Sequence, residues 1–290
     1  MRVRGRTAIV TGSGSGIGEG IAKRLAREGA SVCVTDIFGE RVDRVVDEIR
    51  TVGGAVIGVR ADVSQAEEVT ALCQRALDEF GRIDILVNNA GITSTDIDLT
   101  ETNEEVWDIT LAVNLKSQFL CCQGVTAAMK KQQYGRIVNI ASRSWLGSSR
   151  AVSYAASKGG IVSLTRSLAI ELGRHGITVN CVSPAILVPT SFGVSSQRQF
   201  AAKIGSHLSP TSTEGRTHDM KEETSKAERR SKLEKRAMAL PIPRPAELED
   251  LAYAVLCFAA DEAGYLTGQH IFVGGGADLV SIDSPYWAGG

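Results

Sequence analysis

The feature that most constrains the fold is the alternation of short apolar runs with helical patterns along nearly the whole chain. Strands are expected near residues 7–10, 31–35, 55–59, 83–87, 136–140, 178–182 and 270–273. Helices are expected at residues 16–27, 40–51, 64–80, 103–132, 153–172 and 246–260, and the third opens on a Ser/Glu capping box, Ser64 and Glu67. Apolar strands joined by helical crossovers form a parallel sheet that is covered on both faces. The sequence therefore predicts an α/β, doubly wound, seven-stranded parallel sheet with a long helical insert after strand six.

The domain organisation follows from this order of elements. One domain accounts for residues 1–290, with an insert at 191–240 and a C-terminal tail at 277–290. Within 214–236 there are eight Lys or Arg and six Asp or Glu among 23 residues, and the pairs Glu222/Lys226 and Glu228/Lys232 have the spacing that supports an exposed helix. The insert is interpreted either as a solvated helix or as a mobile lid over a substrate pocket, because it leaves the sheet at its carboxyl edge.

Composition excludes several classes of partner. The formal net charge of −1 and the pI of about 6.5 give no electrostatic footprint for nucleic acid, so a small-molecule partner is expected. No apolar run has the roughly 18 residues that a membrane span requires, and the N-terminus leads directly into a strand without a signal peptide, which indicates a cytoplasmic protein with no membrane partner. The six cysteines are scattered, so neither a disulfide framework nor a metal site is expected.

A glycine-rich segment, Thr-Gly-Ser-Gly-Ser-Gly-Ile-Gly, joins the first expected strand to the first expected helix at 11–18. Glycines allow a sharp turn and a close approach of the backbone to a pyrophosphate, while the N–H groups at the helix start face the anion. A tight turn without a ligand, or a cofactor such as S-adenosylmethionine, can use similar spacing. The position between strand and helix favours a Rossmann dinucleotide site.

An acidic residue supports that interpretation. Asp36 ends the second expected strand, 18 residues after Gly18, where a carboxylate accepts both ribose hydroxyls of NAD and repels the additional phosphate of NADP. Its neighbours, Thr35 and Ile37, are not basic, and Ser15 rather than Lys or Arg precedes Gly16. The sequence therefore predicts NAD as the cofactor.

Tyr154 and Lys158 form an i,i+4 pair near the start of an expected helix, which brings phenol and ammonium to one helix face. A free phenol has a pKa of about 10, and a nearby cation favours the phenolate that a base requires. Ser142, at the end of a strand 12 residues earlier, can hydrogen-bond a substrate oxygen as its charge changes. An amphipathic helix with an inward-facing tyrosine is the alternative interpretation of the pair.

Taken together, the motifs resemble those of the classical short-chain dehydrogenases/reductases over about residues 5–276. The resemblance rests on Thr-Gly-x-x-x-Gly-x-Gly at 11–18, Asn-Asn-Ala-Gly at 88–91, Asn114, Ser142, and Tyr-x-x-x-Lys at 154–158. It implies that Tyr154 moves the proton, that Lys158 lowers the tyrosine pKa and holds the nicotinamide ribose, that Ser142 positions the substrate oxygen, and that Asn114 seats a water. The cofactor residues expected on all these grounds are Gly12, Ser15, Gly16, Ile17, Gly18, Asp36, Ile37, Asp62, Val63, Asn89, Ala90, Gly91, Tyr154, Lys158, Val188 and Thr190.

Some positions depart from the family pattern. Pro184-Ala185 stands where the family usually has Pro-Gly, and Gly274 stands where it usually has Asp. The resemblance implies that Val188 and Thr190, which come one residue later than is typical, contact the nicotinamide carboxamide. The change at Gly274 and an added tail at 282–290 are expected to affect packing or assembly rather than chemistry. Arg143 either contacts a substrate anion or points to solvent. The substrate pocket is expected to draw on Thr93, Ser94, Arg143, Trp145, Leu146 and Phe192.

The predicted function is an NAD-dependent oxidoreductase that interconverts a secondary alcohol and a ketone. A non-catalytic dinucleotide-binding scaffold or sensor is the alternative, and a nucleotide-sugar epimerase is disfavoured because its glycine spacing differs. The family resemblance also implies a homotetramer, with helices 103–132 and 153–172 forming one interface. The alternative is that the apolar faces of these helices cover the sheet alone.

Overall fold

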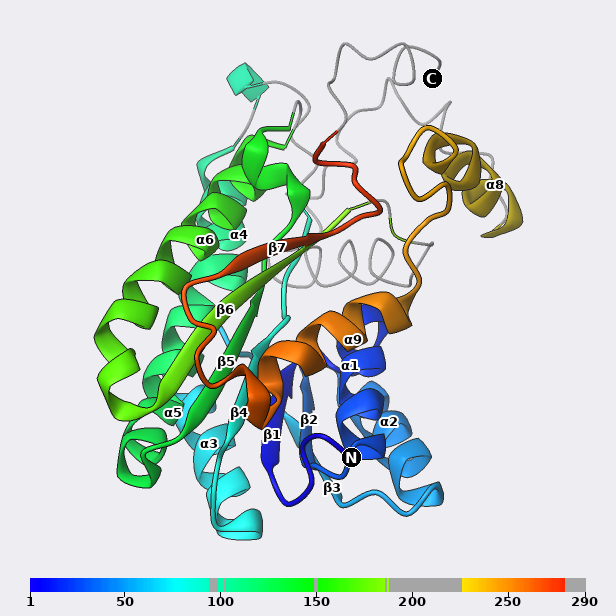
Figure 1. Ribbon diagram of the computed structural model, residues 1–290. Helices are drawn as coiled ribbons and strands as arrows, with labels where there is room; N and C mark the ends of the chain where they lie inside the picture. The colour runs from blue at the N-terminus through cyan, green and yellow to red at the C-terminus, as the bar shows by residue number, and fades with distance from the viewer. Residues whose placement is uncertain (94–98, 102, 149–150, 186, 188–225, 280–290) are drawn as a thin grey trace.

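The computed structural model describes residues 1–93, 99–101, 103–148, 151–185, 187 and 226–279. Their central element is one sheet of seven parallel strands in the order β3-β2-β1-β4-β5-β6-β7 (Figure 1). The strands are β1 (Thr7–Thr11), β2 (Ser31–Asp36), β3 (Val56–Arg60), β4 (Ile85–Asn88), β5 (Gly135–Ile140), β6 (Ile177–Pro184) and β7 (His270–Val273). The strand order reverses between β1 and β4, and in such sheets ligands bind beyond the carboxyl ends of the strands at this switch point. The predicted fold class is confirmed.

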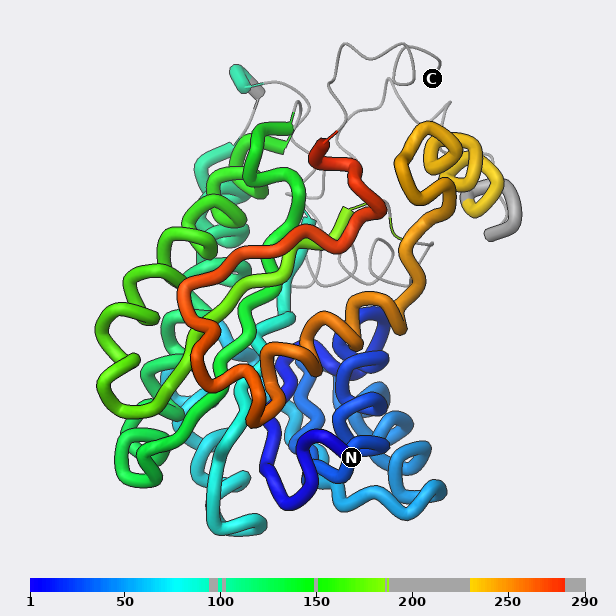
Figure 2. The backbone as a smooth tube through the Cα atoms, viewed as in Figure 1, coloured from blue at the N-terminus to red at the C-terminus, as the bar shows by residue number. Residues whose placement is uncertain are grey.

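Helices cover both faces of the sheet, and the smooth backbone trace shows the two layers (Figure 2). One face is covered by α1 (Gly16–Arg27), α2 (Gly39–Thr51) and α9 (Leu248–Ala259). The helices on the other side are α3 (Ala66–Phe80), α4 (Glu104–Leu111), α5 (Ser117–Gln132) and α6 (Val152–Leu172). Among the described residues, no helix combines the length and the hydropathy needed to span a bilayer.

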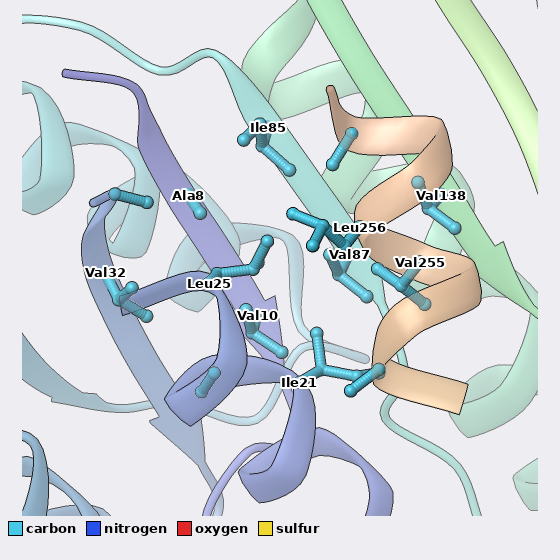
Figure 3. Close-up of a cluster of buried hydrophobic side chains, with 14 of the residues drawn as sticks. Ala8, Val10, Ile21, Leu25, Val32, Ile85, Val87, Val138, Val255 and Leu256 are labelled. Atoms are coloured by element: carbon cyan, nitrogen blue, oxygen red, sulfur yellow. The ribbon is translucent and has the colours of Figure 1, made fainter. Parts of the chain in front are cut away.

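Alternate residues of each strand enter opposite cores. Ala8 and Val10 pack with Ile21, Leu25 and other residues of α1 and α9, and Figure 3 shows this cluster between the helices and β1, β4 and β5. Ile9, between them, points to the other side and packs with residues of α3 and α5. Since side chains of a strand alternate with period two, near-continuous apolar runs are what a sheet buried on both faces requires.

The start of α3 differs from the prediction. The helix begins at Ala66, and its first turn has no side-chain cap. The Ser64 hydroxyl donates to Asp62 Oδ1 at 2.7 Å, and the Ser64 N–H donates to the same oxygen at 3.0 Å. The expected Ser64/Glu67 capping box is therefore wrong, because a local turn closed by Asp62 takes the serine hydroxyl. A capping box does occur at α9, between Glu247 and Asp250.

The region expected as one long helix, 103–132, is interrupted. A π-helical segment, Ala112–Lys116, lies between α4 and α5 and contains Asn114. Segments of this kind insert an additional residue into a helix and are frequent at functional sites.

The described part of the insert contains the helix α8 (Lys226–Ala237), which lies apart from the two helical layers (Figure 1). Arg230 and Glu234 form an exposed i,i+4 ion pair on it, at 2.9 Å. Ala237 and Leu240 are buried against Ala185 and Ala277, so the end of the helix is anchored to the carboxyl edge of the sheet. The remainder of the insert and most of the tail lie outside the described residues.

Candidate active site

A cavity of about 220 Å³ lies beyond the carboxyl ends of β1 to β6. It brings together most of the residues that the sequence predicts for the site: Gly12, Ser15, Gly16, Ile17, Asp36, Ile37, Asp62, Val63, Asn89, Ala90, Gly91, Ser142, Tyr154 and Lys158. The other lining residues were not predicted: Ala61, Ile92, Val113, Ile140, Ala141, Pro184 and Leu187. Most of these are apolar residues near strand ends, and the carboxyl-end rule is the signal that would have found them.

The conformation of the glycine loop allows its backbone to approach a ligand closely. Gly12 and Gly16 have φ of 61° and 60°, the left-handed region that favours glycine. A Cβ on Gly12 would lie 2.8 Å from the Cα of Ala90, so a larger residue would displace the strand-end loop. Ser15 precedes α1 without a side-chain cap, which leaves the first N–H groups of the helix available to an anion. These features fit a pyrophosphate.

Gly18 has a different role from the other loop glycines, because it does not line the cavity. A Cβ at this position would lie 2.4 Å from the carbonyl oxygen of Gly12. Glycine here permits the close packing of α1 against the loop.

Asn89 fastens the glycine loop to β4. Its side-chain amide donates to the carbonyl oxygens of Thr11 at 2.9 Å and Gly12 at 3.1 Å. The Thr11 hydroxyl in turn accepts the backbone N–H groups of Asn89 and Ala90, both at 3.0 Å. The family resemblance implies a cofactor contact for Asn89, and the structure adds that Asn89 holds the loop in place.

Asp36 is buried at the end of β2, with 4% of its surface exposed. Its carboxylate accepts the N–H groups of Gly14 and Phe38, both at 3.2 Å. Burial raises the pKa of this carboxyl, while the two backbone hydrogen bonds and the charge of Arg41 act in the opposite direction. A desolvated carboxylate with further lone pairs fits an acceptor for ribose hydroxyls.

A second acid, Asp62, lines the cavity beside Val63, after β3, which pairs with the strand that ends in Asp36. Its side chain accepts the Ser64 hydroxyl, and its backbone N–H donates to Glu68 at 2.8 Å. These hydrogen bonds fix the turn that brings Asp62 to the cavity.

Tyr154, Ser142 and Lys158 converge at the opposite end of the cavity from Asp36 along the sheet. Burial raises the pKa of Tyr154, and the nearby Ser142 hydroxyl acts in the opposite direction without offsetting it. The ammonium of Lys158 donates to the carbonyl oxygen of Ile140 at 3.0 Å and lies 5.5 Å from the centroid of the Tyr154 ring. Burial lowers the pKa of Lys158 to about 8. In the protein alone the expected depression of the tyrosine pKa is thus not present, because desolvation outweighs the favourable contacts.

Asn114 lies next to the Tyr154, Ser142 and Lys158 group and holds neighbouring segments of the chain together. Its side chain exchanges two hydrogen bonds with the backbone of Ile92, at 2.7 and 3.0 Å, and donates to the Ser157 hydroxyl at 3.1 Å. A Cβ on Gly91 would lie 3.1 Å from Asn114 Oδ1 and 3.7 Å from Lys158 Nζ. Gly91 therefore keeps open the space between the asparagine and the lysine. Asn114 itself does not line the cavity.

The expected substrate residues are not brought to the cavity. Arg143, Trp145 and Leu146 form a 3₁₀ turn after Ser142, and none of them lines it. Trp145 instead packs on rings of β7, 5.3 Å from His270 and 6.2 Å from Phe272, because this edge strand offers two aromatic partners. Leu146 is largely exposed, and Thr93 is half-buried away from the cavity lining. Ser94, Val188, Thr190 and Phe192 lie outside the described residues.

The two departures from the family pattern touch each other. A Cβ on Gly274, after β7, would lie 2.5 Å from the Cβ of Ala185, after β6. The methyl group of Ala185 therefore occupies the space that a side chain at 274 would need, which agrees with a role in packing.

Comparison with known proteins identifies the family. Residues 6–199 match the family model described as short chain dehydrogenase. The chain belongs to this family. A relative from Thauera aromatica, named (2S)-[(R)-hydroxy(phenyl)methyl]succinyl-CoA dehydrogenase subunit BbsD, is 39% identical over 279 residues, which are 96% of this chain and 99% of the relative. This short-chain dehydrogenase is therefore an oxidoreductase by family.

Solved structures agree with this assignment. Levodione reductase superposes with a TM-score of 0.82 at 29% identity and covers 97% of this chain and 100% of its own. A variant actinorhodin polyketide ketoreductase with NADPH superposes with a TM-score of 0.78 at 32% identity, over 93% of this chain and 96% of its own. The family binds a nicotinamide dinucleotide, and the second structure holds the phosphorylated form.

Proposed function

We propose that this short-chain dehydrogenase interconverts a secondary alcohol and a ketone with NAD as its redox partner. The observation that carries the proposal is the meeting of Tyr154, Ser142 and the buried Lys158 in the same cavity as the glycine loop. A scaffold that only binds a dinucleotide has no need for this arrangement, and the relatives are named as dehydrogenases and reductases.

The residues of the cavity fit the dinucleotide end to end. The open N–H groups of α1 and the close approach at Gly12 and Gly16 would hold the pyrophosphate, and Asp36 would accept the adenosine ribose hydroxyls. Lys158 would hold the ribose next to the nicotinamide, which when bound accepts or supplies the hydride. Asp36 supports NAD over NADP, since its charge repels a 2′-phosphate at close range.

The protein's own task is to move a proton and to hold the oxygen that reacts. In the oxidation direction Tyr154 takes the hydroxyl proton of the alcohol while the Ser142 hydroxyl donates to the same oxygen. Because burial raises the tyrosine pKa, the phenolate depends on positive charge nearby, and Lys158 is the cation within the site. In the reverse direction Tyr154 returns the proton to the developing alkoxide.

The proposed substrates are small-molecule alcohols and ketones. Since one relative is named for a succinyl-CoA thioester, the test panel includes hydroxyacyl and oxoacyl thioesters of coenzyme A beside free alcohols and ketones. A cytoplasmic location is part of the same proposal. All six cysteines are free thiols, which suits a reducing compartment.

The decisive experiment follows NADH absorbance during turnover of this panel by wild type and by Tyr154→Phe. The variant is expected to lose about 10²–10⁴-fold in kcat, because general acid–base catalysis contributes that much, while NADH still binds in a fluorescence titration. Val52→Ala, at the exposed position directly after α2, serves as a control for nonspecific damage. Retained turnover in Tyr154→Phe would remove the tyrosine from the reaction.

A further inference from the structure

Two side chains donate to the carbonyl oxygen of Ile140, the last residue of β5. The ammonium of Lys158 donates to it at 3.0 Å, and the side-chain amide of Gln118 donates to it at 3.4 Å. Only the nitrogen of an amide can donate to a carbonyl, so this contact also fixes the orientation of the Gln118 side chain. Ile140 and Lys158 line the cavity, whereas Gln118 does not. Gln118 therefore meets the site through this shared carbonyl.

The Gln118 side chain is not explained by stability alone. The residue is 1% exposed and lies near the start of α5, one turn after Asn114. Its Oε1 is buried and has no hydrogen-bond partner in the part of the chain that the structure describes. A buried acceptor without a partner costs free energy, and an apolar side chain of similar size would avoid that cost. A glutamine at this position therefore calls for another role.

Lys158 is the group that such a role would serve. In the protein alone its ammonium is held by the Ile140 carbonyl and lies 5.5 Å from the centroid of the Tyr154 ring. In the proposed function the same ammonium holds a ribose of the cofactor and supports the Tyr154 phenolate. A lysine that gives up the Ile140 carbonyl for these contacts removes a charged donor from a buried oxygen, which reduces the gain in free energy. The contact of Gln118 with that oxygen is longer than an ideal hydrogen bond and can shorten when the ammonium leaves.

Asn114, one turn before Gln118, is not available for this exchange. Its amide donates to the carbonyl oxygen of Ile92 at 3.0 Å and to the Ser157 hydroxyl at 3.1 Å, and its Oδ1 accepts the Ile92 N–H at 2.7 Å. Asn114 would have to give up these contacts to serve another acceptor. The Gln118 amide already faces the carbonyl in question.

Resting on the proposed function, we propose that Gln118 is a positioning residue for Lys158. Its amide takes over the Ile140 carbonyl as the ammonium turns toward the cofactor ribose, so that the lysine moves without leaving a buried acceptor unpaired. Gln118 acts only through Lys158, because it does not line the cavity itself. The glutamine thus favours cofactor binding at the expense of the stability of the protein alone.

The test measures NADH dissociation constants by fluorescence titration in wild type, Gln118→Met, Lys158→Met and the double variant. Gln118→Met is expected to weaken NADH binding by about 10-fold, because the Ile140 carbonyl loses its second donor. In the Lys158→Met background the same substitution should change the dissociation constant by less than about 2-fold, because no ammonium has to be exchanged. Without cofactor, the midpoint of urea unfolding of Gln118→Met should equal or exceed that of wild type.

Turnover gives an independent readout of the same effect. In ketone reduction the KM for NADH should rise about 10-fold in Gln118→Met, while kcat stays within about 2-fold of wild type, as expected for a residue that acts on cofactor binding. Gln123→Met, at an exposed position of the same helix, is the matched control and should leave all these quantities unchanged. Gln118→Leu replaces Gln118→Met if that variant does not fold.

Two kinds of result would contradict the inference. Unchanged NADH binding in Gln118→Met, or an equal loss with and without Lys158, would overturn it. A loss of NADH affinity accompanied by a lower urea midpoint would also overturn it and leave Gln118 a packing residue. Wild type that does not bind NADH would instead refute the proposed function.

Discussion

The proposed chemistry requires a charged Lys158, and burying that charge lowers the stability of the folded protein. The side chain is buried, and its contact with the Ile140 carbonyl replaces only part of the hydration that an ammonium loses. Burial therefore lowers its pKa to about 8 from the ordinary 10.5. A site that requires a positive charge in this place has to hold it at the expense of folding free energy.

This predicts a pH-dependent difference between wild type and Lys158→Met. The unfolded chain binds the lysine proton more tightly than the folded protein, so the free energy of unfolding of wild type rises relative to the variant as the pH increases from about 8 to about 10.5. The pKa difference corresponds to about 3 kcal/mol over the whole range. Denaturant unfolding of both proteins at pH 7, 8, 9 and 10 measures it. A constant difference across these pH values would contradict the lowered pKa.

The helix and strands that hold the glycine loop are positioned by close backbone contacts as well as by side chains. The junction of β1 and α1 depends on Gly18, whose missing side chain lets the helix approach the Gly12 carbonyl. Asn89 reaches over from β4 to the same carbonyl at 3.1 Å. The loop is thus held between two strands and a helix before any ligand binds.

Gly18→Ala is therefore expected to destabilise the fold and the binding site together. A methyl group would lie 2.4 Å from the Gly12 oxygen, and overpacking of this kind costs about 1–3 kcal/mol. Thermal unfolding and NADH titration measure the two effects. Gly173→Ala is the matched control, because a Cβ there has nothing within 4 Å. Equal stabilities of the two variants would show that the loop relaxes without cost.

Across the whole molecule, residues distant in sequence meet at the amino edge of the sheet, opposite the site. The fully buried carboxylate of Asp84 accepts the Thr7 N–H at 2.9 Å and two Arg82 donors at 2.6 Å each. Arg6 lies 3.6 Å from Asp84 and pairs with Asp261, after α9, at 2.8 Å. This cluster joins the residues around the start of β1 to the segment that follows α9.

Asp84→Ala should weaken the fold without altering the chemistry. Loss of a buried carboxylate that satisfies several donors is expected to cost about 3 kcal/mol in the free energy of unfolding. The exposed Asp47→Ala is the control and should change stability by less than about 0.5 kcal/mol. Chemical denaturation gives both values, and kcat/KM at a temperature where all proteins are folded should be unchanged. A fall in kcat/KM would mean that the two edges of the sheet are coupled.

The proposed homotetramer is testable on exposed apolar residues of α5 and α6. Phe119 is 47% exposed and Ile170 is 85% exposed, so both side chains are accessible to a second copy of the chain. Ile170→Glu and Phe119→Glu should each lower the molar mass measured by light scattering, because an interface that buries a new charge is weakened. Glu171→Gln, next to Ile170, is the control. Unchanged masses in both variants would mean that α5 and α6 cover the sheet alone.

Much of the site could be predicted because parallel strands bring residues after their carboxyl ends to one edge. The loop at 11–18, Asp36 and the Tyr154/Lys158 pair reach the cavity for that reason. The turn that Ser64 forms with Asp62 and the packing of Trp145 on the rings of β7 could not be predicted, because sequence spacing does not reveal these partners.

The contact between Ala185 and position 274 has a consequence for how sequences of this family can change. An aspartate introduced at 274 would meet the Ala185 methyl group, since even its Cβ would lie 2.5 Å away. Exchange of Ala185 for glycine removes that obstacle and leaves Gly274 undisturbed. The family's usual pair, glycine at 185 and aspartate at 274, is therefore accessible from this chain only if position 185 changes first. The order in which the two substitutions can occur is thus set by one steric contact.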